Sequence, residues 1–173
     1  TDGNGCIGTD SFTVDIYPAI SIDLVSSNPL CYNQASGSIE AIVTGGTPDY
    51  TYLWSNSQNT AVVNNLFAGD YSVTVHDSNN CIAEAETSLV YPPELVATTT
   101  TVPTECGELI GSASVNASGG TGSYSYVWNT TDSTQQITNL PPGDYYCTVT
   151  DINGCTVEAL AEVGAYGEGE TQI

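Results

Sequence analysis

Residues 45–81 read GGTPDYTYLWSNSQNTAVVNNLFAGDYSVTVHDSNNC, and this stretch decides the fold. Its aromatic and aliphatic residues recur at every second position, first over residues 50–54 and again over residues 71–75. A period of two is typical of one face of a β-strand, and the Gly-Gly, Gly-Asp and Asn-Asn pairs mark turns between strands. No segment of useful length shows the period of a helix. The stretch therefore predicts an all-β fold.

The same pattern occurs twice, which makes the chain a tandem array. Residues 31–84 align with residues 106–158 across a single one-residue gap. The sequence TDGNGCIGTDSFTVDIYP, at the start of the chain, matches the end of each copy. We therefore expect four segments, namely the C-terminal strands of a preceding repeat (1–19), two whole repeats (20–92 and 93–166) and a linker or tail (167–173). Arrays of this kind serve reach, spacing or multivalent contact.

Each whole repeat has the sequence features of an immunoglobulin-like β-sandwich. About seven short strands are separated by turn signals at intervals of roughly 8–12 residues. A Trp on an early strand and a later Gly-Asp-Tyr step correspond to the core Trp and the tyrosine corner of such domains. We expect four aromatic residues to lie in the cores: Trp54, Tyr71, Trp128 and Tyr145. The predicted fold class is all-β, with tandem immunoglobulin-like sandwiches in an extended array.

The charge of the chain excludes several kinds of partner. There are 20 Asp and Glu residues, one His, and no Lys or Arg, so the net charge is −20. Nucleic acid and anionic lipid surfaces are bound through Lys and Arg, so neither is an expected partner. No apolar run is long enough for direct membrane insertion. Hydrophobic residues still make up 40% of the chain, which is enough to form a core, and repulsion between carboxylates favours an extended array.

The aligned cysteines predict a disulfide inside each repeat. The expected pairs are Cys31 with Cys81 and Cys106 with Cys155, because only this scheme serves both copies. Cys147 has no counterpart in the first copy; it is either a free buried thiol or the partner of Cys106 in place of Cys155. Zinc is not favoured, since no two cysteines have C-x-x-C spacing. Regular cysteines without catalytic partners indicate an oxidising, extracytoplasmic compartment.

An Asp-x-Asn turn precedes each of three aligned cysteines. Asp and Asn oxygens one residue apart can face one hard cation, which makes calcium the candidate cofactor. The candidate ligands are Asp2, Asn4, Asp77, Asn79, Asp151 and Asn153. The alternative is an ordinary hairpin turn, because no complete EF-hand loop follows and Asn and Gly tolerate positive φ.

No catalytic residue is expected, and the chain is not predicted to be an enzyme. His76 lies beside Asp77, but the aligned residue of the next repeat is Thr150. No Ser-His-Asp or Cys-His set can be completed more than once in the chain.

The motifs GG-x-x-x-Y-x-Y-x-W and G-D-Y-x-V-x-V-x-D, followed by Asn-Cys or Gly-Cys, resemble the SprB-type repeat of very large surface adhesins of gliding and other Bacteroidota. The resemblance covers residues 1–163, although Gly122 and Cys147 depart from the pattern. It implies a cell-surface filament or adhesin that is secreted across the outer membrane. The implied partners are neighbouring repeats of the same chain or filament and surface polysaccharide or another glycan. In such a host, the sequence Asp-Ser-Thr makes Ser133 a candidate O-glycosylation site.

These observations together predict a structural role. We expect a repeat segment of an extracellular adhesin or filament, which acts as a spacer or fibre and adheres through many weak contacts. Short Pro-containing links favour a semi-rigid rod. One alternative is a carbohydrate-binding β-sandwich module of a secreted glycan-active protein, which would need a platform of exposed aromatic residues. Another is a subunit of a strand-exchanged surface fibre, with which the incomplete repeat at residues 1–19 is compatible.

Overall fold

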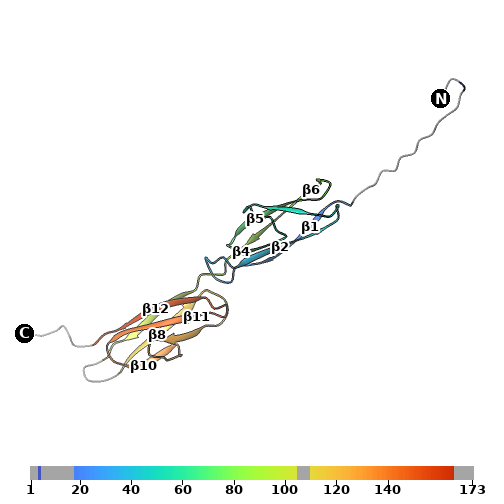
Figure 1. Cartoon of the computed structure of the whole chain (residues 1–173). Helices are drawn as coiled ribbons and strands as arrows, with labels where there is room; N and C mark the ends of the chain where they lie inside the picture. The colour runs from blue at the N-terminus through green and yellow to red at the C-terminus, as the bar shows by residue number, and fades with distance from the viewer. Residues whose placement is uncertain (1–3, 5–17, 105–109, 166–173) are drawn as a thin grey trace, which may run out of the picture.

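The computed structural model describes residue 4, residues 18–104 and residues 110–165. These residues form two all-β modules that lie end to end in an elongated molecule (Figure 1). We call strands β1–β6 the first module and strands β7–β12 the second module. The described residues contain no helix.

The first module consists of β1 (Ser21–Ser27), β2 (Gly37–Thr44), β3 (Thr51–Trp54), β4 (Val62–Leu66), β5 (Gly69–His76) and β6 (Ile82–Leu89). The second consists of β7 (Val96–Val102), β8 (Gly111–Ser118), β9 (Ser125–Trp128), β10 (Gln136–Leu140), β11 (Gly143–Thr150) and β12 (Thr156–Val163). The described residues thus hold six strands per module, where the sequence predicted about seven.

Each module is a sandwich of two three-stranded antiparallel sheets. In the first module the sheet orders are β1-β2-β4 and β3-β5-β6, and in the second they are β10-β8-β7 and β12-β11-β9. The long hairpins β5–β6 and β11–β12 pair over their whole lengths. A further parallel bridge joins Thr104 to Ala165, and the Thr104 N–H donates to the Gly164 carbonyl at 2.9 Å. This bridge ties the end of β7 to the end of β12.

The strand alternation seen in the sequence corresponds to burial between the sheets. Trp54 and Trp128 are each 2% exposed, and their indole N–H groups donate to the carbonyls of Thr60 and Thr134 at 2.9 and 2.8 Å. The polar end of each indole is therefore satisfied while its rings fill the core. Tyr145 is also buried, at 8% exposed, whereas Tyr71 is half-buried.

Each module contains a tyrosine corner. The hydroxyl of Tyr71 donates to the Phe67 carbonyl at 3.0 Å, and that of Tyr145 donates to the Pro141 carbonyl at 2.9 Å. The Gly of each Gly-Asp-Tyr step has a positive φ, 153° at Gly69, which a residue with a side chain rarely adopts. The corner fixes the crossing from the β4 sheet to the β5 sheet, as in immunoglobulin-like domains.

Candidate functional site at the module junction

The turn between β5 and β6 is organised by one carboxylate. Asp77 is buried, and its Oδ1 accepts the backbone N–H groups of Asn79 at 2.9 Å and Cys81 at 2.8 Å. Its Oδ2 accepts the N–H of Thr47, in the loop after β2, at 2.9 Å. These N–H donors, the one of Thr47 first, lower the pKa of Asp77. The carboxylate therefore holds the cysteine in place and ties two loops of the module together.

The second module repeats this arrangement. Asp151 is buried; its Oδ1 accepts the N–H groups of Asn153 and Cys155 at 2.9 Å each, and its Oδ2 accepts the N–H of Thr121 at 2.9 Å. Two Asp side chains in two modules thus present two cysteines in the same way. The sequence singled out these Asp residues as cation ligands, but their donors include a backbone N–H from a loop 30 residues away.

Among the described residues, no cluster of metal-binding side chains supports the calcium hypothesis. These residues contain no group of three or more His, Cys, Asp or Glu side chains placed to hold one ion. Asp2 lies outside the described residues, and Asn4 is described alone. Calcium binding by Asp77, Asn79, Asp151 and Asn153 stays a prediction.

The polypeptide enters both modules in the same way. The carbonyl of Pro18 accepts the Gly46 N–H at 2.8 Å, and the carbonyl of Pro93 accepts the Gly120 N–H at 2.9 Å. A Cβ atom at Gly119 would overlap the Glu94 carbonyl, which explains the Gly-Gly pair at this loop. The incoming chain is therefore held against the loop after β2 in one module and after β8 in the other.

A disulfide joins the two modules. Cys31, in the loop between β1 and β2, is bonded to Cys155, in the turn between β11 and β12, with 5.6 Å between their Cα atoms. The predicted pairs Cys31–Cys81 and Cys106–Cys155 are therefore wrong. The bond links positions 124 residues apart and crosses from one repeat to the next.

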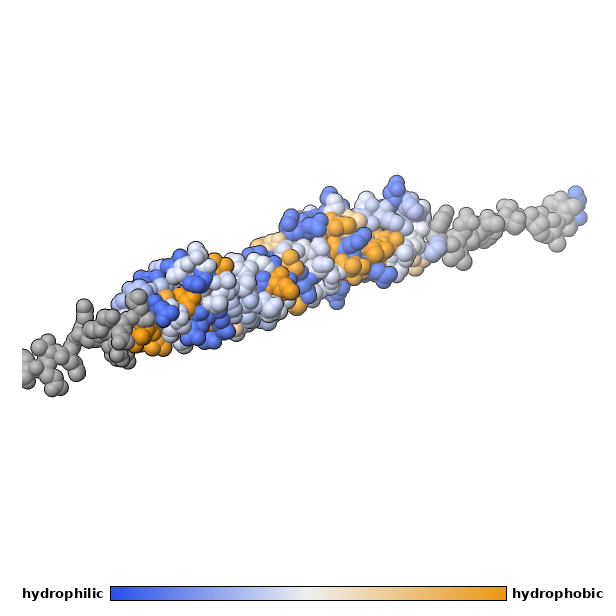
Figure 2. Space-filling view, turned by 90° about the horizontal axis from the view of Figure 1, so that it is seen from below, coloured by the Kyte–Doolittle hydropathy of each residue, from blue (hydrophilic) through white to orange (hydrophobic). Residues whose placement is uncertain are grey.

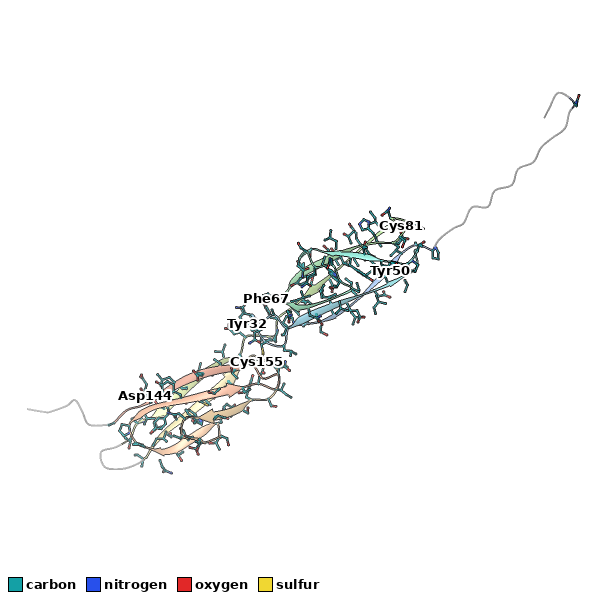
Figure 3. All side chains as sticks on the ribbon, viewed as in Figure 1. Tyr32, Tyr50, Phe67, Cys81, Asp144 and Cys155 are labelled. Carbon is teal, nitrogen blue, oxygen red and sulfur yellow. A yellow bond between two sulfur atoms is a disulfide. The ribbon has the colours of Figure 1, made fainter. Side chains whose placement is uncertain are left out.

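The direction of the strands explains this correction. Cys81 lies at the end of the first module that faces away from the second, whereas Tyr32, next to Cys31, lies at the junction with Cys155 (Figure 3). The strand β6 begins directly after Cys81 and runs toward the junction, and a strand of its eight residues spans roughly 26 Å. A disulfide needs Cα atoms within about 7 Å. Cys31 and Cys81 are therefore too far apart to bond, although they stand at aligned positions of one repeat.

The remaining described cysteines carry no disulfide. Cys81 is exposed, and Cys147 is fully buried in the core of the second module, opposite Trp128 in the β9–β11 pairing. Burial raises the pKa of the Cys147 thiol. Of the alternatives for Cys147, the structure shows the free buried thiol. Cys6 and Cys106 lie outside the described residues.

Further contacts surround the disulfide. The Asn153 side-chain amide donates to the Leu30 carbonyl of the first module at 3.2 Å. The rings of Tyr32 and Tyr91 pack at 60° with centroids 5.4 Å apart, so the Cys31 loop lies against the link between modules. Cys31 is 8% exposed and packs with the buried core of the second module. The junction is therefore a packed interface around a covalent bond.

A small groove of about 190 Å³ opens beside the disulfide. It is lined by residues of both modules and of the link, among them Cys31, Tyr32, Pro93, Leu95 and Cys155. Its volume is below the roughly 300–1,000 Å³ of ordinary small-molecule sites. The groove follows from the meeting of the two modules.

The other residues singled out in the sequence lie apart from the junction. His76 ends β5, half-buried, between Thr51 of β3 and Ile82 of β6. Ser133 is exposed in the connection between β9 and β10. Both Trp side chains are buried, and Figure 2 shows the apolar residues of one face as separate groups among hydrophilic ones. That face carries no continuous apolar platform.

The SprB repeat family matches residues 24–59 and residues 98–133. The chain contains two SprB-type repeats. The two matched stretches begin in β1 and β7 and cover the cysteine loop, the second strand and the Trp strand of each module. A search of curated protein sequences finds no match to this chain.

Several solved structures similar to these SprB-type repeats are of immunoglobulin domains. A structure on Dscam isoform specificity has 17% identity and a TM-score of 0.36, over 87% of this chain and 46% of that one. DIP-gamma IG1+IG2 has 9% identity and a TM-score of 0.40, over 87% and 99%. Murine CEACAM1b has 12% identity and a TM-score of 0.32, over 84% and 99%. The chain spans about half the length of the Dscam structures that it matches.

The described part of this SprB-type array has no helix that is long and apolar enough to cross a membrane. Its repeats are of the kind found in cell-surface or extracellular proteins. The sequence had singled out Cys31 and Cys155 as disulfide cysteines but gave each another partner, because it missed that the two face each other across the junction. The signal that could have found this pair is the strand direction, which places the two cysteines of one repeat at opposite ends.

Proposed function

We propose that this chain is a spacer segment of a cell-surface adhesin or filament, in which repeats 20–92 and 93–166 hold a fixed orientation. The observation that carries the proposal is the Cys31–Cys155 disulfide between modules. A flexible string of beads would have one covalent connection at each junction, whereas this junction has two. The second connection restricts both bending and twisting between the modules.

The charge of the chain supports an extended form. The sequence contains 20 acidic side chains and no Lys or Arg, so no Lys or Arg can form a salt bridge between modules. Carboxylates on neighbouring modules repel each other, and this repulsion opposes folding of the array back on itself. The disulfide holds the modules together against the same repulsion at the junction.

Adhesion by such a segment comes from many weak contacts along the rod. Each repeat contributes a similar surface, so the affinity of the array exceeds that of one module when several contacts form at once. Surface polysaccharide or another glycan is the proposed target, and secretion across the outer membrane of a gliding bacterium is the proposed setting. Neighbouring repeats of the same chain or filament are the proposed structural partners.

Small-angle X-ray scattering of the oxidised chain and of the Cys31→Ser/Cys155→Ser double variant tests the rod. The oxidised chain should give a narrow distance distribution with a long maximum dimension. The double variant should give a broader distribution with a shorter mean. Cys81→Ser removes a thiol away from the junction and is the matched control, so it should scatter like the parent chain. Identical scattering by the oxidised chain and the double variant would contradict the proposal.

Adhesion is tested separately by presenting the chain on beads at increasing density over surfaces coated with polysaccharide. Retention that rises more steeply than density supports multivalent adhesion. Retention that is absent at every density would leave the segment as a spacer alone.

A further inference from the structure

The end of the first module that faces away from the second carries an exposed thiol at the position where the second module carries its disulfide. Cys81 lies at the end of the β5–β6 turn, as Cys155 lies at the end of the β11–β12 turn. Cys155 is bonded to Cys31 of the preceding module, whereas Cys81 carries no disulfide. We call this end of the first module, formed by the loop after β2 and the β5–β6 turn, the receiving end.

The receiving end is built like the surface that the second module presents to the first. Asp77 holds the Cys81 N–H at 2.8 Å, as Asp151 holds the Cys155 N–H at 2.9 Å. The second oxygen of each Asp accepts an N–H from the preceding loop at 2.9 Å, from Thr47 in the first module. The free thiol is therefore presented with the geometry that the bonded one has.

The incoming chain sets the same direction of approach at both ends. Pro18 and Pro93 accept equivalent backbone N–H groups, from Gly46 at 2.8 Å and from Gly120 at 2.9 Å. In a module that precedes Pro18, the last strand would therefore run toward the receiving end, as β6 runs toward the second module. This anchoring is independent of the cysteine and indicates the orientation of the partner.

The differences between the two ends are those expected of a free and an occupied site. Asn153 donates its side-chain amide across the junction to Leu30, whereas Asn79 donates its amide within the module to the Thr47 hydroxyl at 2.8 Å. Cys155 is 8% exposed because the first module covers it, whereas Cys81 is exposed. Cys81 is therefore accessible to a neighbour at the receiving end.

We propose that Cys81 forms a disulfide with the cysteine of a preceding module that occupies the position of Cys31. This inference rests on the proposed role of the chain as a row of modules. The occupant of the receiving end is a further copy of the module, which presents its loop between the first two strands. The Cys31–Cys155 bond is then one member of a series in which each module is bonded to the next.

The bond forms by thiol–disulfide exchange with a disulfide oxidant, either a small-molecule disulfide or that of a thiol oxidoreductase. One cysteine loses its proton, attacks the oxidant and releases one oxidant sulfur as a thiol. The second cysteine then attacks the mixed disulfide and releases the other sulfur. Two module thiols are oxidised to one disulfide, and the oxidant disulfide is reduced to two thiols.

A chain with one more module tests the proposal. A copy of residues 20–75 is placed directly before Thr1, because residues 1–18 align with residues 76–93 and complete that module. The extended chain is oxidised with a glutathione redox buffer, digested without reduction and mapped by mass spectrometry. The expected result is a peptide in which the added copy of Cys31 is bonded to Cys81, together with the Cys31–Cys155 peptide. Maleimide labelling of Cys81 should fall to background.

The same digest separates failure of this inference from failure of the proposed function. A Cys31–Cys155 bond accompanied by a free Cys81 thiol overturns the inference and leaves the rod intact. Cys81 bonded to another cysteine also overturns it. A missing Cys31–Cys155 bond overturns the proposed function.

Two variants of the extended chain control for misfolding. Cys31→Ser in the added copy should restore full labelling of Cys81, and it leaves both original modules unchanged. Cys81→Ser should remove the upstream bond and keep the Cys31–Cys155 peptide. Loss of the Cys31–Cys155 peptide in the Cys81→Ser variant would show that Cys81 supports the fold instead of the junction, and this result would contradict the proposal.

Discussion

Cys31 and Cys155 join two modules through a disulfide that spans 124 residues of sequence. Each cysteine is 8% exposed, because the other module covers it. The bond therefore belongs to the interface and constrains both modules at once. The predictions below separate what it contributes from what each module contributes alone.

Removal of the junction bond should lower stability without loss of either fold. The Cys31→Ser/Cys155→Ser double variant should lose about 2–4 kcal/mol of unfolding free energy, since the unfolded chain is no longer closed into a loop. Denaturant unfolding followed by Trp fluorescence measures this, because Trp54 and Trp128 report one module each. Reduction of the parent chain should give the same loss, and a reduced double variant should show no further change. A double variant as stable as the oxidised parent would contradict the prediction.

The tyrosine corner of the second module should contribute one hydrogen bond to stability. Tyr145→Phe removes the hydroxyl that donates to the Pro141 carbonyl, so the unfolding free energy should fall by about 0.5–1.5 kcal/mol. Tyr146→Phe is the matched control, because Tyr146 is adjacent and 47% exposed. Denaturant titration of the two variants measures the difference. Equal stabilities for the two variants would show that the corner bond contributes nothing.

The turn at Asp77 should make the first module sensitive to acid. The pKa of Asp77 is lower in the folded chain than in the unfolded chain, chiefly through the N–H of Thr47. Its stabilisation is therefore fully present above the ordinary carboxyl pKa of about 3.9 and is lost as the pH falls through the lowered folded value. Asp77→Asn should lower the melting temperature of the first module at pH 7, and the difference from the parent should shrink below about pH 4. A difference that stays constant with pH would contradict this assignment.

The two cysteines without disulfides should react differently with maleimide. Cys81 is exposed and should be labelled in the native chain. Cys147 is fully buried and burial raises its pKa, so its reactive thiolate is scarce and inaccessible until the chain unfolds. Peptide mapping after labelling with and without denaturant measures both. Native labelling of Cys147 at the rate of Cys81 would show that the core of the second module opens.

Calcium binding by the Asp-x-Asn turns predicts a melting temperature that rises with calcium when ionic strength is fixed and high. The Asp77 and Asp151 carboxylates each accept three backbone N–H groups, and the described residues contain no cluster of three or more metal-binding side chains. Differential scanning calorimetry with calcium and with chelator measures this. A rise of several degrees with millimolar calcium would support the Asp-x-Asn turns as ligands, and an unchanged melting temperature would leave them as turns held by backbone N–H groups.

Much of the fold could be predicted from the sequence because it depends on local pattern. The alternation over residues 50–54 and 71–75 corresponds to strands β3 and β5, and the Gly-Asp-Tyr steps correspond to the tyrosine corners. These features depend on neighbours a few residues away. The repeat strengthened the predictions made from these features, since residues that matter to the fold recur in both copies.

The disulfide pairing could not be predicted from spacing because it depends on where each cysteine lies in space. Aligned cysteines in one repeat suggest a bond within that repeat, but Cys31 is bonded to Cys155 at the junction, whereas Cys81 lies at the other end of the first module. The hydrogen-bond partners of the Asp-x-Asn turns could not be predicted from the sequence for a similar reason. The donor that explains Asp77 is the Thr47 N–H, which lies 30 residues earlier and has no sequence signature of its own.

The position of the junction bond also sets how the molecule would transmit a pull on its two ends. Tension that enters before Cys31 passes through the bond to Cys155 and leaves along β12, so the 124-residue interval between them is bypassed. That interval would otherwise release roughly 400 Å of extended chain as its strands unravelled. With the bond intact, only the segments outside this interval can lengthen. A row of modules bonded in this way therefore resists extension under tension.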